Sequence, residues 1–162
     1  MSTLKKNILL IIADDLGRDL SIYDHHNTAR TPNLEKLAAQ GTVFENAFAS
    51  TASCSGSRST IYTGLHTHQN GQYGLQRGYK FLHYFTTFDI IETHPKIFNG
   101  LGYLTGIAGK IHVGPPPVYP FTVSNHKHTR DCQWISGCLD SFITRAHDEE
   151  RPFFYTVGFI DP

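Results

Sequence analysis

The sequence has no excess of charge of either sign. Its 162 residues include 14 Lys and Arg and 14 Asp and Glu, so the formal net charge is zero when His is neutral. Binding to nucleic acid or to an anionic membrane surface usually depends on a basic excess or on a run of like charges. We therefore expect neither a nucleic acid nor a membrane among the partners of this protein.

Long apolar runs are also missing. A membrane-spanning helix needs about 20 consecutive apolar residues, and no stretch of the sequence approaches that length. Residues 8–13 follow Lys5 and Lys6, as the apolar part of a secretion signal would. However, the run is short and ends in Asp14 and Asp15 rather than at a small-residue cleavage site. We interpret it as a strand, and the sequence leaves the cellular location open.

Cysteine is scarce. Cys54, Cys132 and Cys138 make an odd count, and although Cys132 and Cys138 could pair, their spacing matches no specific motif. The absence of a Cys-x-x-Cys motif argues against a zinc ribbon. The chain is long enough for one domain with a hydrophobic core.

The sequence pattern alternates between strand and helix signals. Strands are expected at residues 7–13, 42–49, 101–108 and 153–160, helices at 54–64, 31–41, 90–100 and 133–149, and an exposed polar loop at 122–131. The continuously apolar and β-branched first segment favours a central parallel strand that is buried on both faces. Together the elements predict an α/β fold with a mostly parallel central sheet flanked by helices.

Two adjacent carboxylates follow the first predicted strand. Asp14 and Asp15 lie at its carboxyl end, and binding sites in open α/β sheets collect at that edge. Adjacent carboxylates repel each other unless a cation or hydrogen bonds offset their charge, and oxygen ligands suit Ca²⁺ or Mg²⁺. The pair is thus a candidate cation site, although on its own a solvated strand-to-loop turn explains it somewhat better.

A cysteine begins the predicted helix at residues 54–64. Ser53 is placed to cap this helix through its hydroxyl, and Arg58, four residues after Cys54, is expected on the same helix face. A thiol at a helix N-terminus beside a guanidinium lies in positive potential, which would also stabilise a bound anion. Taken alone, the pattern also fits a small buried cysteine near a surface arginine.

A lysine and a histidine follow the strand predicted at residues 101–108. Lys110 and His112 are two residues apart, so that in an extended chain both side chains would face one pocket. Such a pair can hold an oxyanion and transfer a proton to a leaving group. Without further context, a Lys-x-His sequence is usually a surface feature.

These motifs together resemble those of the sulfatase family. Residues 54–58, Cys-Ser-Gly-Ser-Arg, followed by Thr63 and Gly64, are similar to the family signature Cys-x-Pro-Ser-Arg with its downstream Thr-Gly, with Gly56 where proline is usual. The resemblance implies an alkaline-phosphatase-like fold. It also implies that a formylglycine-generating enzyme converts Cys54 to Cα-formylglycine, whose hydrate attacks the sulfur of the substrate.

The resemblance extends to the other candidate residues. It implies that Asp14, Asp15 and residue 54 hold a divalent cation, which would be Ca²⁺ by resemblance, while the residues themselves suit Mg²⁺ equally well. It further implies that Arg58 binds the formylglycine diol. Lys110 and His112 match a Gly-Lys-x-His element that contacts the substrate, with Lys110 on a sulfate oxygen and His112 in proton transfer.

Several longer stretches resemble the sulfamidase group within the family. They are His68-Gln-Asn-Gly71, Tyr73-Gly-Leu75, Lys110-Ile-His-Val-Gly-Pro115 and Val118-Tyr-Pro-Phe121. The expected activity is hydrolysis of a sulfuric ester or a sulfamate, with a small-molecule or saccharide sulfate as substrate. A phosphomonoester or phosphonate hydrolase of the same superfamily is the alternative enzyme.

The resemblance also predicts that the site is incomplete. Residues 1–162 correspond to the N-terminal portion of a sulfatase catalytic domain, and the family's remaining metal ligands would lie beyond residue 162. From this we expect the 162-residue piece alone to be catalytically inactive. A truncated, inactive sulfatase-like fragment is therefore the non-enzymatic alternative.

Overall fold

The computed structural model describes residues 5–23, 29–76 and 84–162. Its centre is a four-stranded sheet in the order β1-β4-β2-β3. The strands are β1 (Ile8–Ile12), β2 (Leu104–Gly109), β3 (Val123–His126) and β4 (Phe153–Gly158). All three strand pairs are parallel, which confirms the predicted α/β class and places the carboxyl ends of the strands at one edge.

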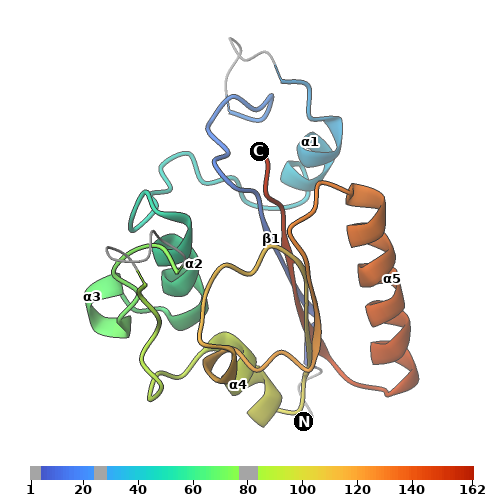
Figure 1. Cartoon of the computed structure of the whole chain (residues 1–162). Helices are drawn as coiled ribbons and strands as arrows, with labels where there is room; N and C mark the ends of the chain where they lie inside the picture. Colours follow the sequence, from blue (N-terminus) through green and yellow to red (C-terminus); the bar gives the residue numbers. More distant parts are fainter. Residues whose placement is uncertain (1–4, 24–28, 77–83) are drawn as a thin grey trace.

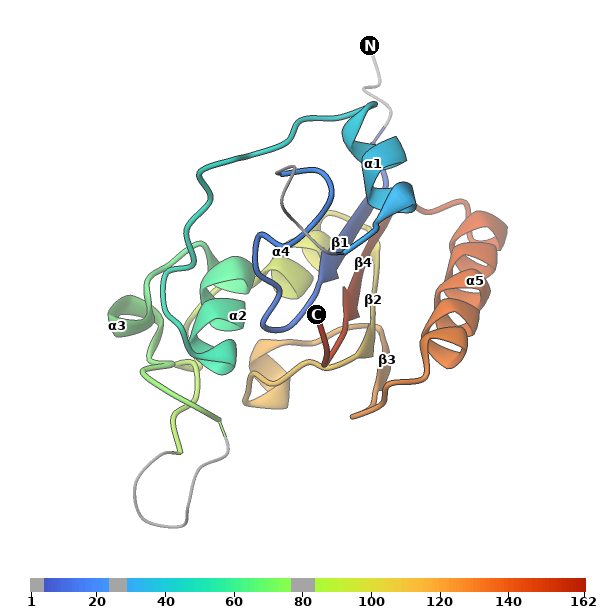
Figure 2. The same ribbon diagram turned by 90° about the horizontal axis from the view of Figure 1, so that it is seen from above.

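Helices cover both faces of this sheet (Figures 1 and 2). The long helix α5 (Cys132–Asp148) lies on one side, and α2 (Cys54–Thr63), α3 (Thr67–Asn70) and α4 (His94–Gly100) lie on the other. The remaining helices are α1 (Pro32–Ala38) and the short 3₁₀ helix η1 (Pro116–Val118). Among the described residues, no helix is long and apolar enough to cross a membrane.

A separate apolar core lies on each face. Under α5, Phe142 packs against Tyr155 of β4 with ring centroids 4.3 Å apart, and Leu104 of β2 is fully buried beside them. On the opposite face, Tyr62 of α2 packs against Tyr119 beside η1. Burial of a side chain such as Phe142 or Leu104 contributes about 1.5–3 kcal/mol, so these two cores fix the sheet between its helices.

The first strand forms where predicted but is not central. β1 pairs with β4 on one side, and no described strand pairs with its other side. In addition, Leu9 and Ile11, whose side chains point to the same face of the sheet, are 45% and 56% exposed. The predicted burial on both faces is therefore wrong for β1, whereas β2 and β4, each hydrogen-bonded to a neighbour on both sides, are the buried strands.

Two further segments differ from the prediction. Residues 42–49 form an irregular connection rather than a strand, because they pair with no neighbour and leave Phe44 and Phe48 70% and 90% exposed. The expected polar loop at residues 122–131 contains β3, a four-residue edge strand whose alternate residues are exposed. The polar sequence of β3 does not signal a strand, because an edge strand with one exposed face lacks a continuous apolar run.

Candidate active site

The site forms where β1 ends and α2 begins. Asp14 follows the strand, and Asp15 turns the chain with a positive φ of 55°. The Asp14 carboxylate is 12% exposed and is bound by two cations: Oδ1 accepts a hydrogen bond from Arg58 Nη2 at 2.9 Å, and Oδ2 accepts one from Lys110 Nζ. Burial alone would raise the pKa of Asp14, but the hydrogen bonds from Lys110 and Arg58 outweigh it and lower the pKa below its ordinary value.

Arg58 is fixed in place by acceptors from three separate segments. Its side chain is 2% exposed, and besides Asp14 it donates to the carbonyl oxygens of Lys110 at 2.8 Å and Phe159 at 3.2 Å. Burial raises the pKa of nearby Tyr62 to about 12, so that this phenol stays neutral and does not offset the guanidinium charge. The predicted helical proximity to Cys54 is confirmed, while the alternative of a surface arginine is wrong because the side chain is buried.

Cys54 is the first residue of α2, and its thiol contacts a histidine. Its Sγ lies 3.1 Å from His112 Nδ1. The predicted capping of this helix by the Ser53 hydroxyl is wrong, because that oxygen is buried without a hydrogen-bond partner. The first intrahelical bond of α2 is donated by Ser57 to the Ser53 carbonyl, and the amides before Ser57 therefore keep the positive end of the helix next to Cys54.

Lys110 and His112 reach the site through a turn rather than through strand alternation. β2 ends at Gly109, whose φ of 81° is left-handed, and a Cβ there would lie 2.2 Å from the Gly158 carbonyl oxygen. Only glycine allows this close approach, after which Lys110 N donates to that same carbonyl at 2.7 Å. A positive φ of 51° at His112 then directs its ring to Cys54, whereas Lys110 turns to Asp14.

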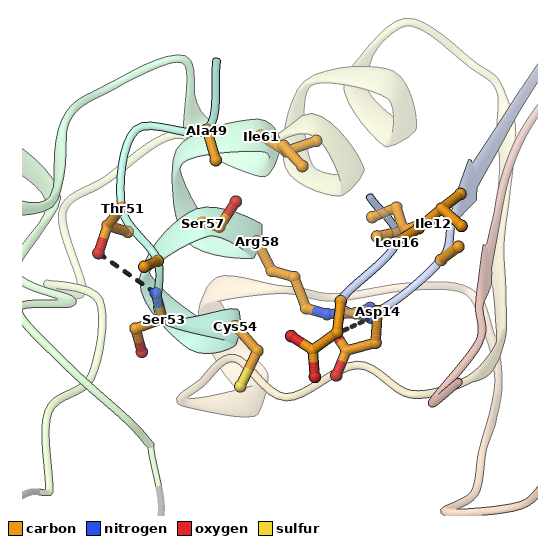
Figure 3. A pocket seen from close by; sticks show the side chains of 13 residues that line it. Ile12, Asp14, Leu16, Ala49, Thr51, Ser53, Cys54, Ser57, Arg58 and Ile61 are labelled. Atoms are coloured by element: carbon orange, nitrogen blue, oxygen red, sulfur yellow. Dashed lines mark hydrogen bonds and ion pairs between the residues drawn. The ribbon is translucent and has the colours of Figure 1, made fainter. Parts of the chain in front are cut away.

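Asp14, Cys54 and Arg58 line one hollow of about 240 Å³. Figure 3 shows it between α2, which carries Cys54 and Arg58, and the end of β1, which carries Asp14. Asp15 also lines it. The predicted residues thus come together from three separate segments, with Lys110 in contact with Asp14 and His112 in contact with Cys54, although neither of the two lines the hollow. Sequence reasoning missed that Lys110 binds Asp14, because no local pattern signals a contact between side chains 96 positions apart.

The donors available for a cation are of the expected type but few. Asp14 and Asp15 both line the hollow, and carboxylate oxygens suit Ca²⁺ or Mg²⁺. In the part of the chain that the structure describes, no three His, Cys, Asp or Glu residues are grouped to hold a metal ion. The carboxylate oxygens of Asp14 and Asp15 are therefore suitable ligands for a divalent cation. Such ions usually take six or more ligands, so these two residues provide only part of the coordination.

A parallel sheet that presents a cysteine, an arginine, a lysine and a histidine around a carboxylate at its carboxyl edge has the site composition of a sulfatase. Over residues 6–162 the sequence matches the family model described as Sulfatase. The chain therefore belongs to the sulfatase family.

Among individual proteins, the chain is similar to human N-sulphoglucosamine sulphohydrolase, with 40% identity over 97% of this chain and 32% of the relative. It is also similar to bovine arylsulfatase A, with 39% identity over 74% of this chain and 23% of the relative. An arylsulfatase from Clostridium perfringens is 33% identical over 69% of this chain and 22% of the relative. The chain thus spans about a third of the length of the first relative and less of the others.

Proposed function

We propose that the protein to which these residues belong hydrolyses sulfuric esters or sulfamates of sulfated saccharides. The observation that carries this proposal is the contact of Cys54 with His112 at the N-terminus of α2, beside the buried Arg58. The sugar class is taken from the name of the human relative, an N-sulphoglucosamine sulphohydrolase.

Positive charge held in fixed positions is the main catalytic resource of the site. Arg58 is held by three acceptors, and Lys110 is held by Asp14. Together with the N-terminus of α2 they create a positive potential at Cys54 before any ligand arrives, so a sulfate group and the charge that develops on its oxygens are stabilised without reorganisation. Of the two cations, we assign Lys110 to a sulfate oxygen, because the Lys110 side chain is more exposed than that of Arg58.

His112 is assigned to proton transfer. Its Nδ1 lies 3.1 Å from Cys54 Sγ, which is within the reach that general acid–base catalysis requires. From this position the imidazole can take a proton from the nucleophilic group on residue 54 or deliver one to the leaving group. The strained φ of 51° at His112 supports a functional role for its orientation.

Two groups complete the proposal. A divalent cation at Asp14 and Asp15, Ca²⁺ or Mg²⁺, would supply Lewis-acid polarisation of a sulfate oxygen. Conversion of Cys54 to formylglycine by a formylglycine-generating enzyme would supply the attacking oxygen, and residue 54 would then also contact the cation.

Gly56 bears on this conversion because it replaces the proline that is usual in the signature. A Cβ at position 56 would lie 2.7 Å from the Thr51 methyl group and 3.2 Å from that of Thr67. Glycine therefore fits the packing of this chain where a residue with a side chain would require its neighbours to move.

The residues described here provide only part of a cation site, and we infer that the 162-residue piece alone binds sulfated ligands without turning them over. The test compares that piece and the full-length protein on N-sulfoglucosamine, an aryl sulfate and an aryl phosphate. Turnover of a sulfated compound by the full-length protein, lost in Cys54→Ala, is the expected result. Faster turnover of the aryl phosphate would favour the phosphomonoester or phosphonate hydrolase, and a native rate in Cys54→Ala would refute the mechanism.

A further inference from the structure

The connection between α3 and α4 contacts both chain segments that meet at Cys54. Its described parts are residues 71–76 and 84–93. On one side the connection contacts the first turn of α2, which begins at Cys54, and on the other it contacts the segment 110–115, which carries His112. Gln76 makes both of these contacts, although no role has been assigned to it above.

The main chain of Gln76 is bound to the residue that follows Cys54. Gln76 N donates a hydrogen bond to Ser55 Oγ at 3.1 Å. Ser55 is fully buried, and a buried hydroxyl that loses a hydrogen-bond partner is costly because water does not replace that partner. The bond therefore fixes the main chain of Gln76 relative to the start of α2.

The side chain of Gln76 packs against the segment that carries His112. A Cβ at Gly114 would lie 2.2 Å from Gln76 Nε2 and 3.2 Å from Gln76 Cδ. The amide group thus occupies the space that a side chain at position 114 would need. Because Gly114 comes two residues after His112, the half-buried Gln76 side chain limits how far the chain around His112 can move away from α2.

The rest of the connection gives Gln76 a fixed support. Gln72 is fully buried, and its Nε2 donates to the Phe85 carbonyl at 2.7 Å. Thr87 N donates to the Gly114 carbonyl at 2.8 Å. Gly114 is therefore held through its carbonyl by Thr87 and is packed against the Gln76 side chain, while Gln72 links the two described parts of the connection.

The contact between Cys54 and His112 joins the same two segments. Cys54 Sγ and His112 Nδ1 are 3.1 Å apart although the residues are 58 positions apart in the sequence. Proton transfer between two groups requires a heavy-atom distance of about 2.6–3.2 Å. A small shift of the segment 110–115 relative to α2 would move the imidazole out of this range, and Gln76 lies where it opposes such a shift.

We propose that Gln76 is a positioning residue, which sets the distance between residue 54 and His112 by bridging Ser55 and Gly114. The inference rests on the proposed function, since the distance matters for the proton transfer assigned there. Gln76 acts through its two neighbours and not on the substrate. Its loss should therefore lower kcat and leave KM unchanged, because Arg58 and Lys110 are held by other contacts.

Steady-state kinetics of the full-length protein on N-sulfoglucosamine test this role. Gln76→Ala removes the side chain that packs on Gly114 but keeps the main-chain donor to Ser55. Gln76→Met restores the length of the side chain without its amide. The matched control is Gln133→Ala, which removes the same kind of side chain from an exposed position on α5, on the other face of the sheet.

Gln76→Ala should lower kcat on the order of tenfold with KM within about twofold of the native value, since a misplacement of about 1 Å can cost about 100-fold. Gln76→Met and Gln133→Ala should keep the native kcat. Adding Gly114→Ala to Gln76→Ala should recover most of the lost kcat, because the new methyl group fills space that the amide leaves. A native kcat in Gln76→Ala, an equal loss in Gln76→Met, or a raised KM at native kcat would overturn the positioning role.

A second measurement separates this inference from the proposed function. In full-length protein made without the formylglycine-generating enzyme, residue 54 remains a cysteine. Alkylation of Cys54 by iodoacetamide, followed by mass spectrometry, should then be several-fold slower in Gln76→Ala than in the native protein and the control, because the imidazole has moved away from Sγ. Unchanged alkylation would refute the positioning role alone, whereas a native protein without sulfatase activity would refute the proposed function and the catalytic part of this inference with it.

Discussion

Replacement of Arg58 by methionine would remove the cation on which the active site is built. The guanidinium is 2% exposed and donates to Asp14, to Lys110 and to Phe159. Methionine keeps much of the apolar volume but leaves two carbonyl oxygens without a donor and leaves the Asp14 carboxylate with Lys110 as its remaining cationic partner.

The expected loss is large because the ion pair is buried. Removing one partner of a buried pair costs about 3–5 kcal/mol, whereas an exposed pair contributes about 0–1 kcal/mol. Since domains are stable by about 5–15 kcal/mol in total, Arg58→Met would lose a considerable part of the stability of the chain. Asp14→Leu alone should also destabilise it, because it leaves Arg58 and Lys110 without their shared carboxylate.

The assay is a double-mutant cycle with Arg58→Met, Asp14→Leu and the two changes combined, followed by urea unfolding and the fluorescence of Trp134. The double variant should be more stable than the sum of the single losses predicts, by about 2 kcal/mol or more, since Arg58 is then no longer buried without its carboxylate, as it is in Asp14→Leu. A coupling below about 0.5 kcal/mol would mean that the pair behaves as an exposed one, and the argument that Asp14 anchors Arg58 would be refuted.

Three further predictions concern other residues in and around the site. Because the pKa of Asp14 is lowered, its contribution to stability should be complete above its ordinary pKa and be lost as the pH falls through the lower folded value, and Asp14→Asn should flatten the unfolding free energy over that acid range. His112→Gln should slow alkylation of the Cys54 thiol by iodoacetamide several-fold, as followed by mass spectrometry, because the imidazole next to Sγ is lost; an unchanged rate would contradict the contact. Gly56→Ala should cost about 1–3 kcal/mol through overpacking against the Thr51 methyl, and Thr51→Ser should recover most of that loss in thermal unfolding.

Local patterns were sufficient for the elements that carry the site. The apolar run before Asp14 predicts a strand with carboxylates at its end, and the four-residue spacing of Cys54 and Arg58 predicts a shared helix face. Both predictions are confirmed because each depends on a short segment whose conformation is set by its own residues. The α/β class is predicted for the same reason, since it follows from the order of such segments.

Features that depend on distant partners could not be predicted. The run at residues 7–13 signals a central strand buried on both faces, but its position in the sheet and the cover of its faces depend on distant segments. Among the described strands β1 has a partner only on the β4 side, and Leu9 and Ile11 are exposed on one face. Likewise, Lys110 and His112 were predicted to share a pocket through strand alternation. Instead, Lys110 turns to Asp14 and His112 turns to Cys54, because Gly109 ends the strand against Gly158, a contact that depends on the position of β4.

The arrangement around Asp14 explains why so much charge is buried at one point. Arg58 and Lys110 bring two positive charges to a single carboxylate, so the cluster keeps one net positive charge next to the N-terminus of α2. Burying these groups costs desolvation free energy, and the unpartnered Arg58 Nε adds to that cost. Under the proposed function, folding would supply this free energy in advance, so that a sulfate group would meet donors that are already oriented and already stripped of water. The strongest constraint on this sequence is therefore the joint positioning of Asp14, Arg58 and Lys110, and a change at any one of them should affect both stability and ligand binding.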